Sequence, residues 1–398
     1  MEILDLEVIN RYRIFENLML NFFKNNILAI NGYKNISCSQ IDRTCPALLR
    51  NIERVERCGG YFFIAIVEMH QLTSLILKGL QHLLQFCFAG FRITCPYKIS
   101  NVDATLAKDQ ATKALNDNQG VLEGARETIA VMGKNYINPL CAVAGWGEVY
   151  MNASMESIIN GYEDPRGKKW YNTALLEGYQ KQLLGIPIGL PMKDGDANIY
   201  SFCSSLNTST IGEKTGAVLM SAAEVWLLRA EAALRGYTKE NPRTCYEYGV
   251  STSFTQWDCA GASEYLESDK TPADYKDVVS GGKVGKDMKA LITISPKWEE
   301  DADIETKLEK IITQKWLACW PESYEAWAEQ RRTGYPKLFK VQNNTGKVID
   351  TDIMIRRLPF STDAATADPA QYATLTEKLG GADNGATRLW WDTGKNSF

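Results

Sequence analysis

Two helical segments on either side of a proline constrain the fold of this chain more than any other feature of its sequence. Residues 304–319 carry apolar side chains at helical spacing, beginning with Ile304, and Pro321 ends this helix because proline lacks the amide hydrogen. A second helix is predicted over residues 322–332, before Gly334. Since a turn of a few residues joins the two helices, we expect them to pack as a helical hairpin.

Capping signals predict two more helices earlier in the chain. Asp103 can cap a helix that stops before Gly120. The sequence Ser221-Ala222-Ala223-Glu224 has the pattern of a capping box, in which the serine oxygen accepts from the Glu224 amide and the Glu224 carboxylate reaches back to the Ser221 amide. Gly236 is the predicted end of that helix. Together these segments predict a mainly α fold with tetratricopeptide-like helix pairs and long ordered loops.

Three segments rich in glycine, asparagine, aspartate and aromatic residues are predicted to be ordered loops: 138–164, 237–283 and 361–398. Residues 292–294 are predicted to form a short strand. Loops are the places where a ligand would meet a helical scaffold of this kind.

The composition argues against several classes of function. The formal net charge is -4, which gives no basic field for nucleic acid. The two histidines, His70 and His82, lie in the first hundred residues, so the rest of the chain cannot supply a Ser/His/Asp system or a histidine-ligated metal. We expect no cofactor, metal site or catalytic residue. No Cys-x-x-Cys pair occurs, and Cys245 and Cys259 can either pair or remain free thiols.

One segment has the mixture of side chains that binds sugars. Sugar rings pack a face of C–H groups on tryptophan or tyrosine, and their hydroxyls need amides, carboxylates or guanidinium groups. We therefore predict ligand binding by Tyr246, Tyr248, Gln256, Trp257 and Asp258, with Tyr200 and Asn198 as further candidates. The alternative for each of these residues is local loop packing.

Other conspicuous residues are expected to be structural. We predict that Glu325, Arg331 and Arg332 form ion pairs that fix a helix pair, and that Trp226, Trp316 and Trp327 are core aromatics. Glycosidases use two carboxylates, but the acidic run of Glu299, Glu300, Asp301 and Asp303 precedes a helix, where acids favour the positive end of the dipole.

Several sequence blocks, in this order and spacing, resemble the SusD/RagB family over residues 99–398. The most distinctive is Glu325-Ala326-Trp327-Ala328-Glu329-Gln330-Arg331-Arg332-Thr333-Gly334-Tyr335-Pro336 after Gln314-Lys315-Trp316. The others are residues 138–140, 146–155, 161–166, 221–232, 356–360, 379–385 and 390–392.

The resemblance implies a helical lipoprotein on the outer face of an outer membrane, which captures oligosaccharide or another nutrient. Its implied partner is a SusC-like TonB-dependent transporter. Residues 1–98 do not match the family pattern: no signal peptide is visible, and Cys38 follows Asn35-Ile36-Ser37 rather than the apolar run of a lipobox. We expect either a reading-frame shift within residues 91–98 or a diverged or recombined N-terminal segment.

The function predicted from these features is nutrient binding at the cell surface, not enzymatic activity, with the ligand delivered to the transporter. Two alternatives belong to other classes. The first is a helical-repeat module that binds only proteins and has no glycan ligand. The second is a glycoside hydrolase, which would release products from polysaccharide, and which we do not expect.

Overall fold

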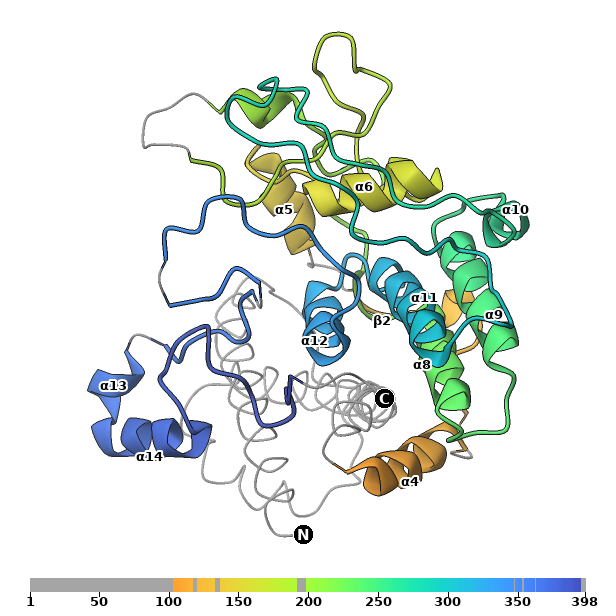
Figure 1. Cartoon of the computed structure of the whole chain (residues 1–398), viewed down its shortest axis with the longest axis vertical. Coiled ribbons are helices and arrows are strands. Elements are labelled where there is room, and N and C mark those ends of the chain that lie inside the picture. The colour runs from red at the N-terminus through yellow and green to blue at the C-terminus, as the bar shows by residue number, and fades with distance from the viewer. Residues whose placement is uncertain are drawn as a thin grey trace, which may run out of the picture. The chain divides into compact units, whose positions relative to one another are not determined.

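A computed structural model describes residues 103–116, 120–132, 137–191, 198–346, 348–352, 354–361 and 363–394. All of them belong to one structural unit, Leu84–Phe398. The described part is mainly helical (Figure 1). The segment predicted to depart from the family pattern, residues 1–98, lies outside the described residues.

The helices follow one another with little strand between them. They are α4 Ala104–Leu115, α5 Pro139–Gly145, α6 Ala153–Tyr162, α7 Gly167–Trp170, α8 Ala222–Leu234, α9 Pro242–Gln256, α10 Ala262–Leu266, α11 Ile304–Ala318, α12 Ser323–Thr333, α13 Ala364–Ala367 and α14 Pro369–Leu379. Two short 3-10 helices are η2 Ala125–Glu127 and η3 Ile199–Phe202. The strands β1 Ile129–Val131 and β2 Ala217–Met220 pair antiparallel, with Ala130 opposite Val218.

The predicted caps are where the helices begin. Asp103 accepts from Leu106 N at the start of α4, and Ser221 accepts from Glu224 N at the start of α8. The capping-box prediction also had the Glu224 carboxylate bond to the Ser221 amide. In the structure this carboxylate instead lies 3.8 Å from Nζ of Lys315. The predicted helix that ends at Gly334 is confirmed as α12, with Gly334 in the left-handed conformation.

The three predicted loops contain helices, so that prediction was wrong over much of their length. Residues 138–164 include α5 and α6, residues 237–283 include α9 and α10, and residues 361–398 include α13 and α14. The asparagines taken as loop residues are caps: Asn138, Asn152 and Asn241 each accept a hydrogen bond from a helix amide.

Two smaller predictions also fail. Residues 292–294 form no strand, although Ile292 and Ile294 are buried in extended chain. Ile304, expected on the apolar stripe of its helix, is the first residue of α11 and is 52% exposed.

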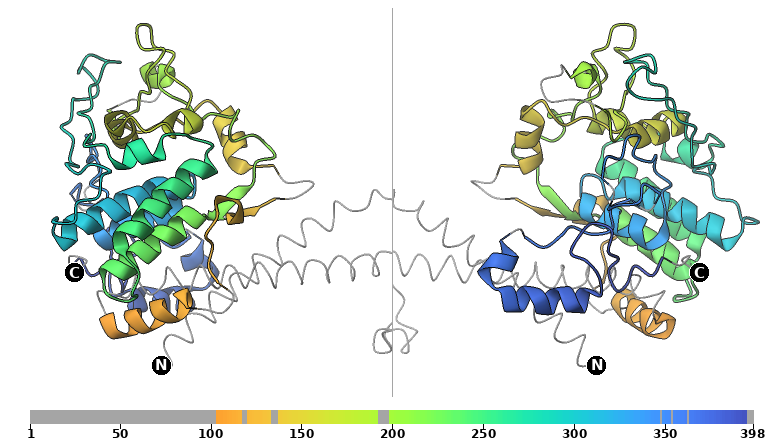
Figure 2. Two further views of the ribbon diagram at one scale, coloured as in Figure 1. Left: turned by 90° about the vertical axis from the view of Figure 1, so that its right-hand side faces the viewer. Right: turned by 60° about the vertical axis from the view of Figure 1, so that its left-hand side comes forward.

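The core is built around α8, which packs against both α9 and α11, while α11 also contacts α9 and α12 (Figures 1 and 2). Leu227 of α8, Val250 of α9 and Ile311 of α11 are completely buried at this junction. Burial of each such side chain contributes about 1.5–3 kcal/mol. The successive pairs α8–α9 and α11–α12 are consistent with the predicted tetratricopeptide-like pairs.

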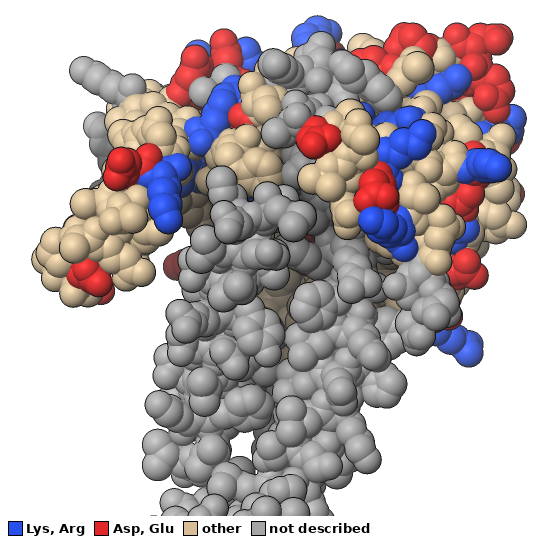
Figure 3. Space-filling view, turned by 90° about the horizontal axis from the view of Figure 1, so that it is seen from below, with Lys and Arg blue, Asp and Glu red and all other residues tan. Residues whose placement is uncertain are grey.

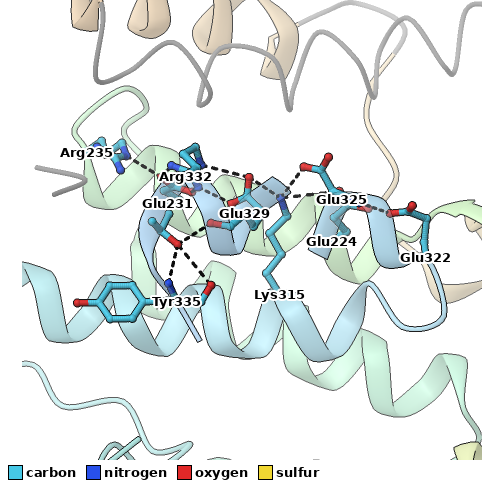
Figure 4. A network of polar contacts seen from close by, with 10 residues as sticks. Glu224, Glu231, Arg235, Lys315, Glu322, Glu325, Glu329, Arg332 and Tyr335 are labelled. Atoms are coloured by element: carbon cyan, nitrogen blue, oxygen red, sulfur yellow. Dashed lines mark hydrogen bonds and ion pairs between the residues drawn. The ribbon is translucent and has the colours of Figure 1, made fainter. Parts of the chain in front are cut away.

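Charged side chains lie inside this helical layer (Figure 4). Nζ of Lys315 on α11 is 3.2 Å from Glu325 and 3.5 Å from Glu329, both on α12. Arg332 of α12 binds both carboxylate oxygens of Glu231 on α8, each at 2.8 Å, and also pairs with Glu329. These ion pairs cross-link α8, α11 and α12.

The predicted ion pairing of α12 is thus confirmed for Glu325 and Arg332. Arg331 behaves differently: its guanidinium donates to the carbonyl of Arg356 at 2.6 Å and lies 3.7 Å above the ring centroid of Trp327. Sequence spacing could not distinguish these environments because Arg331 and Arg332 point to different neighbours from adjacent positions.

Cys245 and Cys259 are both free thiols, so the disulfide alternative does not hold in this structure. Burial raises the pKa of the Cys245 thiol to about 11. Among the described residues, no helix has the length and apolar character needed to cross a membrane.

Candidate functional site

The seven residues predicted to bind a ligand lie at separate places. Tyr246 is fully buried in the core: its hydroxyl donates to the Pro296 carbonyl at 2.6 Å, and its ring lies 5.3 Å from that of Trp298. Burial raises the pKa of Tyr246. In this conformation Tyr246 presents no surface to a ligand and supports the inner side of α9.

Asn198 and Tyr200 belong to a polar cluster that joins two connecting segments. Asn198 caps η3 by accepting from Tyr200 N at 3.0 Å. The fully buried Tyr200 hydroxyl lies 3.2 Å from both carboxylate oxygens of Asp277 and accepts from Gly285 N at 3.0 Å. Burial raises the pKa of Tyr200. This cluster holds the segments in place, and of the two predicted residues Asn198 is the exposed one.

The end of α9 brings Gln256, Trp257 and Asp258 together. The partly buried Trp257 ring meets Trp170 and Trp320 edge to face, with ring centroids 6.0 and 5.2 Å apart. Trp170 and Trp320 stack on each other at 5.0 Å. The predicted residues at this helix end therefore lie on a cluster of three tryptophans.

Polar groups surround this cluster. The exposed Asp258 carboxylate lies 3.6 Å from Nζ of Lys169. Within the described residues, Gln256 Oε1 and Trp257 Nε1 are buried and have no hydrogen-bond partner. Buried polar atoms are usually partnered, so this helix end has hydrogen-bonding capacity that the described residues do not use.

Tyr248, the remaining predicted residue, lies on the outer side of α9 and is 54% exposed. Its ring stacks on Trp226 of α8, with centroids 4.9 Å apart and an interplanar angle of 28°. Trp226 is also covered by the Arg229 guanidinium, 3.7 Å from its ring centroid. This surface consists of the stacked rings of Tyr248 and Trp226, with the Arg229 guanidinium packed against Trp226.

Sequence reasoning missed Trp226, Arg229 and Trp320 as parts of these surfaces. Trp226 was predicted to be a core residue, together with Trp316 and Trp327, but all three are partly buried rather than fully buried. The spacing of Trp226 and Arg229, three apart on one helix, predicts that they can touch. No sequence signal pairs Trp226 with Tyr248, because that contact depends on how α8 meets α9.

The acidic run before α11 has structural partners. Asp303 caps α11 by accepting from Thr306 N at 2.8 Å, and this hydrogen bond lowers the pKa of Asp303. Glu299 lies 2.9 Å from the buried ammonium of Lys310. In the part of the chain that the structure describes, no group of three His, Cys, Asp or Glu side chains is placed to hold a metal ion.

Acidic and basic side chains are interspersed over the described surface that Figure 3 displays. This mixture agrees with the formal net charge of -4. A surface with both signs intermixed favours neither nucleic acid nor any other strongly charged polymer.

Known structures with the same fold match most of this chain. A SusD homologue from Bacteroides vulgatus has a TM-score of 0.75 and 56% identity, over 78% of this chain and 62% of that one. A chitin-binding SusD homologue from Flavobacterium johnsoniae has a TM-score of 0.73 and 34% identity, over 78% and 63%. A SusD-like protein from Bacteroides thetaiotaomicron has a TM-score of 0.71 and 30% identity, over 77% and 63%.

The chain thus spans slightly less than two thirds of the length of each of these relatives. No curated protein sequence matches it. The family model described as SusD-like, SusD and RagB outer membrane lipoprotein, matches residues 91–392. That match starts before residue 99, where the sequence blocks placed the boundary. The chain therefore belongs to the SusD-like family of outer-membrane lipoproteins.

Proposed function

We propose that this protein binds a nutrient glycan at the cell surface and passes it to a SusC-like TonB-dependent transporter in the outer membrane. The observation that carries the proposal is the family match over residues 91–392, together with the 34% identity to a chitin-binding SusD homologue. Oligosaccharides of N-acetylglucosamine are accordingly the first ligands to test.

Binding without cleavage is the chemistry that the described side chains support best. A glycosidase needs two carboxylates across the scissile bond. The most conspicuous acids, Asp303 and Glu299, are engaged in a helix cap and in an ion pair with a buried lysine.

We place one glycan contact at the end of α9. An apolar sugar face would pack on the partly buried rings of Trp257 and Trp320, and sugar hydroxyls would bond to the Asp258 carboxylate and the Lys169 ammonium. Gln256 would contribute its unused amide oxygen after a side-chain rotation. Asn198 is exposed and can bind a ligand from its separate position, whereas Tyr246 and Tyr200 would support the surfaces from beneath.

Calorimetric titration with chitohexaose tests the proposal. We expect saturable binding, accompanied by a change in tryptophan fluorescence. Asp258→Asn keeps a residue type that tolerates the positive φ of 50° at this position but removes the charge. It should weaken binding, whereas Asp109→Asn, at a similar surface pair with Lys113, should not. The absence of measurable binding to oligosaccharides from chitin, cellulose, starch and xylan would overturn the proposal of glycan binding.

A module that binds only proteins is the second candidate, and exposed apolar residues favour it. Leu175 and Phe202 are 72% and 50% exposed and are joined by a backbone hydrogen bond of 2.8 Å. Ile199 stands on the same side of η3 as Phe202, since residues three apart eclipse in a 3-10 helix. Co-purification with the transporter from glycan-free cells, combined with no measurable glycan binding in the titrations, would favour this candidate.

A further inference from the structure

The outer side of α9 presents an aromatic ring that is held rigidly but is not covered. One face of Tyr248 stacks on Trp226, and the residue is nevertheless 54% exposed. The exposed area is therefore the other ring face and the ring edge. A flat ring face open to solvent is the surface that packs against the C–H groups of a sugar.

The support under Tyr248 is fixed by several polar contacts. Trp226 Nε1 donates to the Glu123 carbonyl at 2.9 Å. Arg229, which covers the Trp226 ring, pairs with Glu240 at 2.5 Å and with Glu123 at 3.1 Å. These contacts hold Trp226 in place beneath Tyr248. A ligand that stacks on Tyr248 would therefore lose little binding free energy through ordering of the two rings.

Hydroxyl groups flank the exposed ring. On a helix, positions four before, four after and seven after Tyr248 share its side, and these positions are Thr244, Thr252 and Thr255. Thr244 and Thr255 are exposed, and Thr252 is partly exposed. Each hydroxyl has two acceptor lone pairs, which sugar hydroxyls can use as donors.

The charges near this side of α9 are already paired. Arg243 and Glu247 form an ion pair of 2.7 Å one position before Thr244 and Tyr248 respectively. Arg229 is satisfied by its two glutamate partners. The two arginines and three glutamates named here leave a net charge of -1, and both arginines are already paired. These groups would therefore repel an anionic sugar, which favours a neutral one.

We propose that Tyr248 is a stacking platform for the ring of a neutral pyranose, flanked by Thr244, Thr252 and Thr255 as hydrogen-bonding groups. The proposal rests on the proposed glycan-binding function and adds a second contact, away from the end of α9. The sugar class it selects is an uncharged one with an apolar ring face, such as N-acetylglucosamine or glucose.

Titration of three variants with chitohexaose and cellohexaose tests this platform. Tyr248→Leu keeps apolar bulk but loses the flat face, and should weaken binding about tenfold. Tyr248→Phe keeps the face and should bind within about twofold of the wild type. Tyr324→Leu is the matched control, because Tyr324 is 71% exposed on another helix, and should leave binding unchanged.

Nitration of the wild-type protein by tetranitromethane gives an independent measurement. Saturating chitohexaose should protect Tyr248 from nitration, as mapped by mass spectrometry, and should leave Tyr324 reactive. This measurement does not depend on whether a variant folds.

The possible failures are distinguishable. If the wild-type protein binds a neutral oligosaccharide but Tyr248→Leu binds as tightly and Tyr248 is not protected, the platform is refuted and the proposed function stands. If oligogalacturonate binds and neutral sugars do not, the neutral-ligand assignment is refuted. If no glycan of any charge binds, the proposed function fails together with the platform.

Discussion

Leu227 of α8 occupies the space that a side chain at Gly249 of α9 would need. A Cβ on Gly249 would lie 2.6 Å from Leu227 Cγ and 3.3 Å from the Ala223 carbonyl oxygen. Carbon atoms do not approach this closely without displacement. The absence of a side chain at Gly249 is what lets α8 and α9 pack at their observed separation.

Gly249→Ala should therefore destabilise the protein by about 1–3 kcal/mol, through overpacking against Leu227. Urea unfolding at fixed pH measures this change. Gly145→Ala is the control, because Gly145 is also helical but has nothing within 4 Å of its Cβ position. That variant should be neutral or stabilising by up to about 1 kcal/mol. Equal effects at the two positions would contradict the close-packing explanation.

Replacement of Lys315 by methionine should be strongly destabilising. The Lys315 side chain is completely buried among Glu224, Glu325 and Glu329, at distances of 3.8, 3.2 and 3.5 Å. Its removal takes this cation away from the three carboxylates, although Glu329 keeps its ion pair with Arg332. Breaking a buried ion pair in this way costs about 3–5 kcal/mol. Differential scanning calorimetry should show a clear fall in Tm.

Lys113→Met tests whether that loss reflects burial. Lys113 also pairs with a carboxylate, but its side chain is 66% exposed. A surface pair contributes about 0–1 kcal/mol, so this variant should unfold close to the wild type. A small effect at Lys315 would show that the buried acids take up protons at little cost.

Glu156 should make stability depend on pH. Its carboxylate is 8% exposed and accepts from Gly185 N at 2.5 Å, and burial raises its pKa from 4.5 to about 8. Cys203 and Tyr275 are titratable groups close enough to Glu156 for its charge to raise their pKa values. Because the pKa is higher in the folded state, its contribution is complete below pH 4.5 and is lost as the pH rises through about 8.

Glu156→Gln keeps an acceptor for Gly185 N and removes the titration. The free energy of unfolding of the wild type minus that of the variant should fall as the pH rises from about 5 to about 8.5. Exposed Glu264 on α10 provides the control substitution, Glu264→Gln, for which this difference should stay flat. A pH-independent difference for Glu156→Gln would show that the buried carboxyl does not titrate in this range.

Arg166→Lys should destabilise the protein although it preserves the charge. The fully buried guanidinium binds Asp164 at 2.5 Å, Ser253 of α9 at 2.8 Å and Gln314 of α11 at 3.1 Å. A lysine ammonium cannot reproduce this planar arrangement of donors, and the loss should be at least about 2 kcal/mol.

The matched control for Arg166 is Arg243→Lys. Arg243 pairs with Glu247 at the surface, where its side chain is 43% exposed. Chemical denaturation of this variant should differ from the wild type by less than about 0.5 kcal/mol. Similar losses at both arginines would mean that the buried donor network contributes little.

Sequence reasoning succeeded where a helix is defined by neighbouring residues. Asp103 and Ser221 begin helices because each side chain bonds to an amide three residues ahead, and Gly334 ends one because glycine adopts a positive φ without strain. It failed for α9, where glycine, asparagine, aspartate and aromatic residues suggested a loop although Asn241 caps a long helix.

Because α9 was not predicted, the prediction of the binding residues on it was also inaccurate. Tyr246 and Tyr248 were treated alike, but on a helix, residues two apart point about 200° from each other. One ring is therefore buried against Trp298, and the other lies on the surface against Trp226. The aromatic and polar composition identified the segment as a candidate binding region. Which residues of the segment face the solvent could not be predicted without knowing that it is a helix.

The sequence alone determined the mainly helical class and the principal helix starts, because these depend on residues close together in the chain. The order and spacing of its sequence blocks determined the family resemblance. The tertiary structure decided which charges are buried around Lys315, which tyrosine faces solvent and which rings stack. Those features join residues far apart in sequence, such as Trp226 with Tyr248 and Trp170 with Trp320. Helix packing fixes such contacts, because a side chain's environment is set by the helix that lies against it.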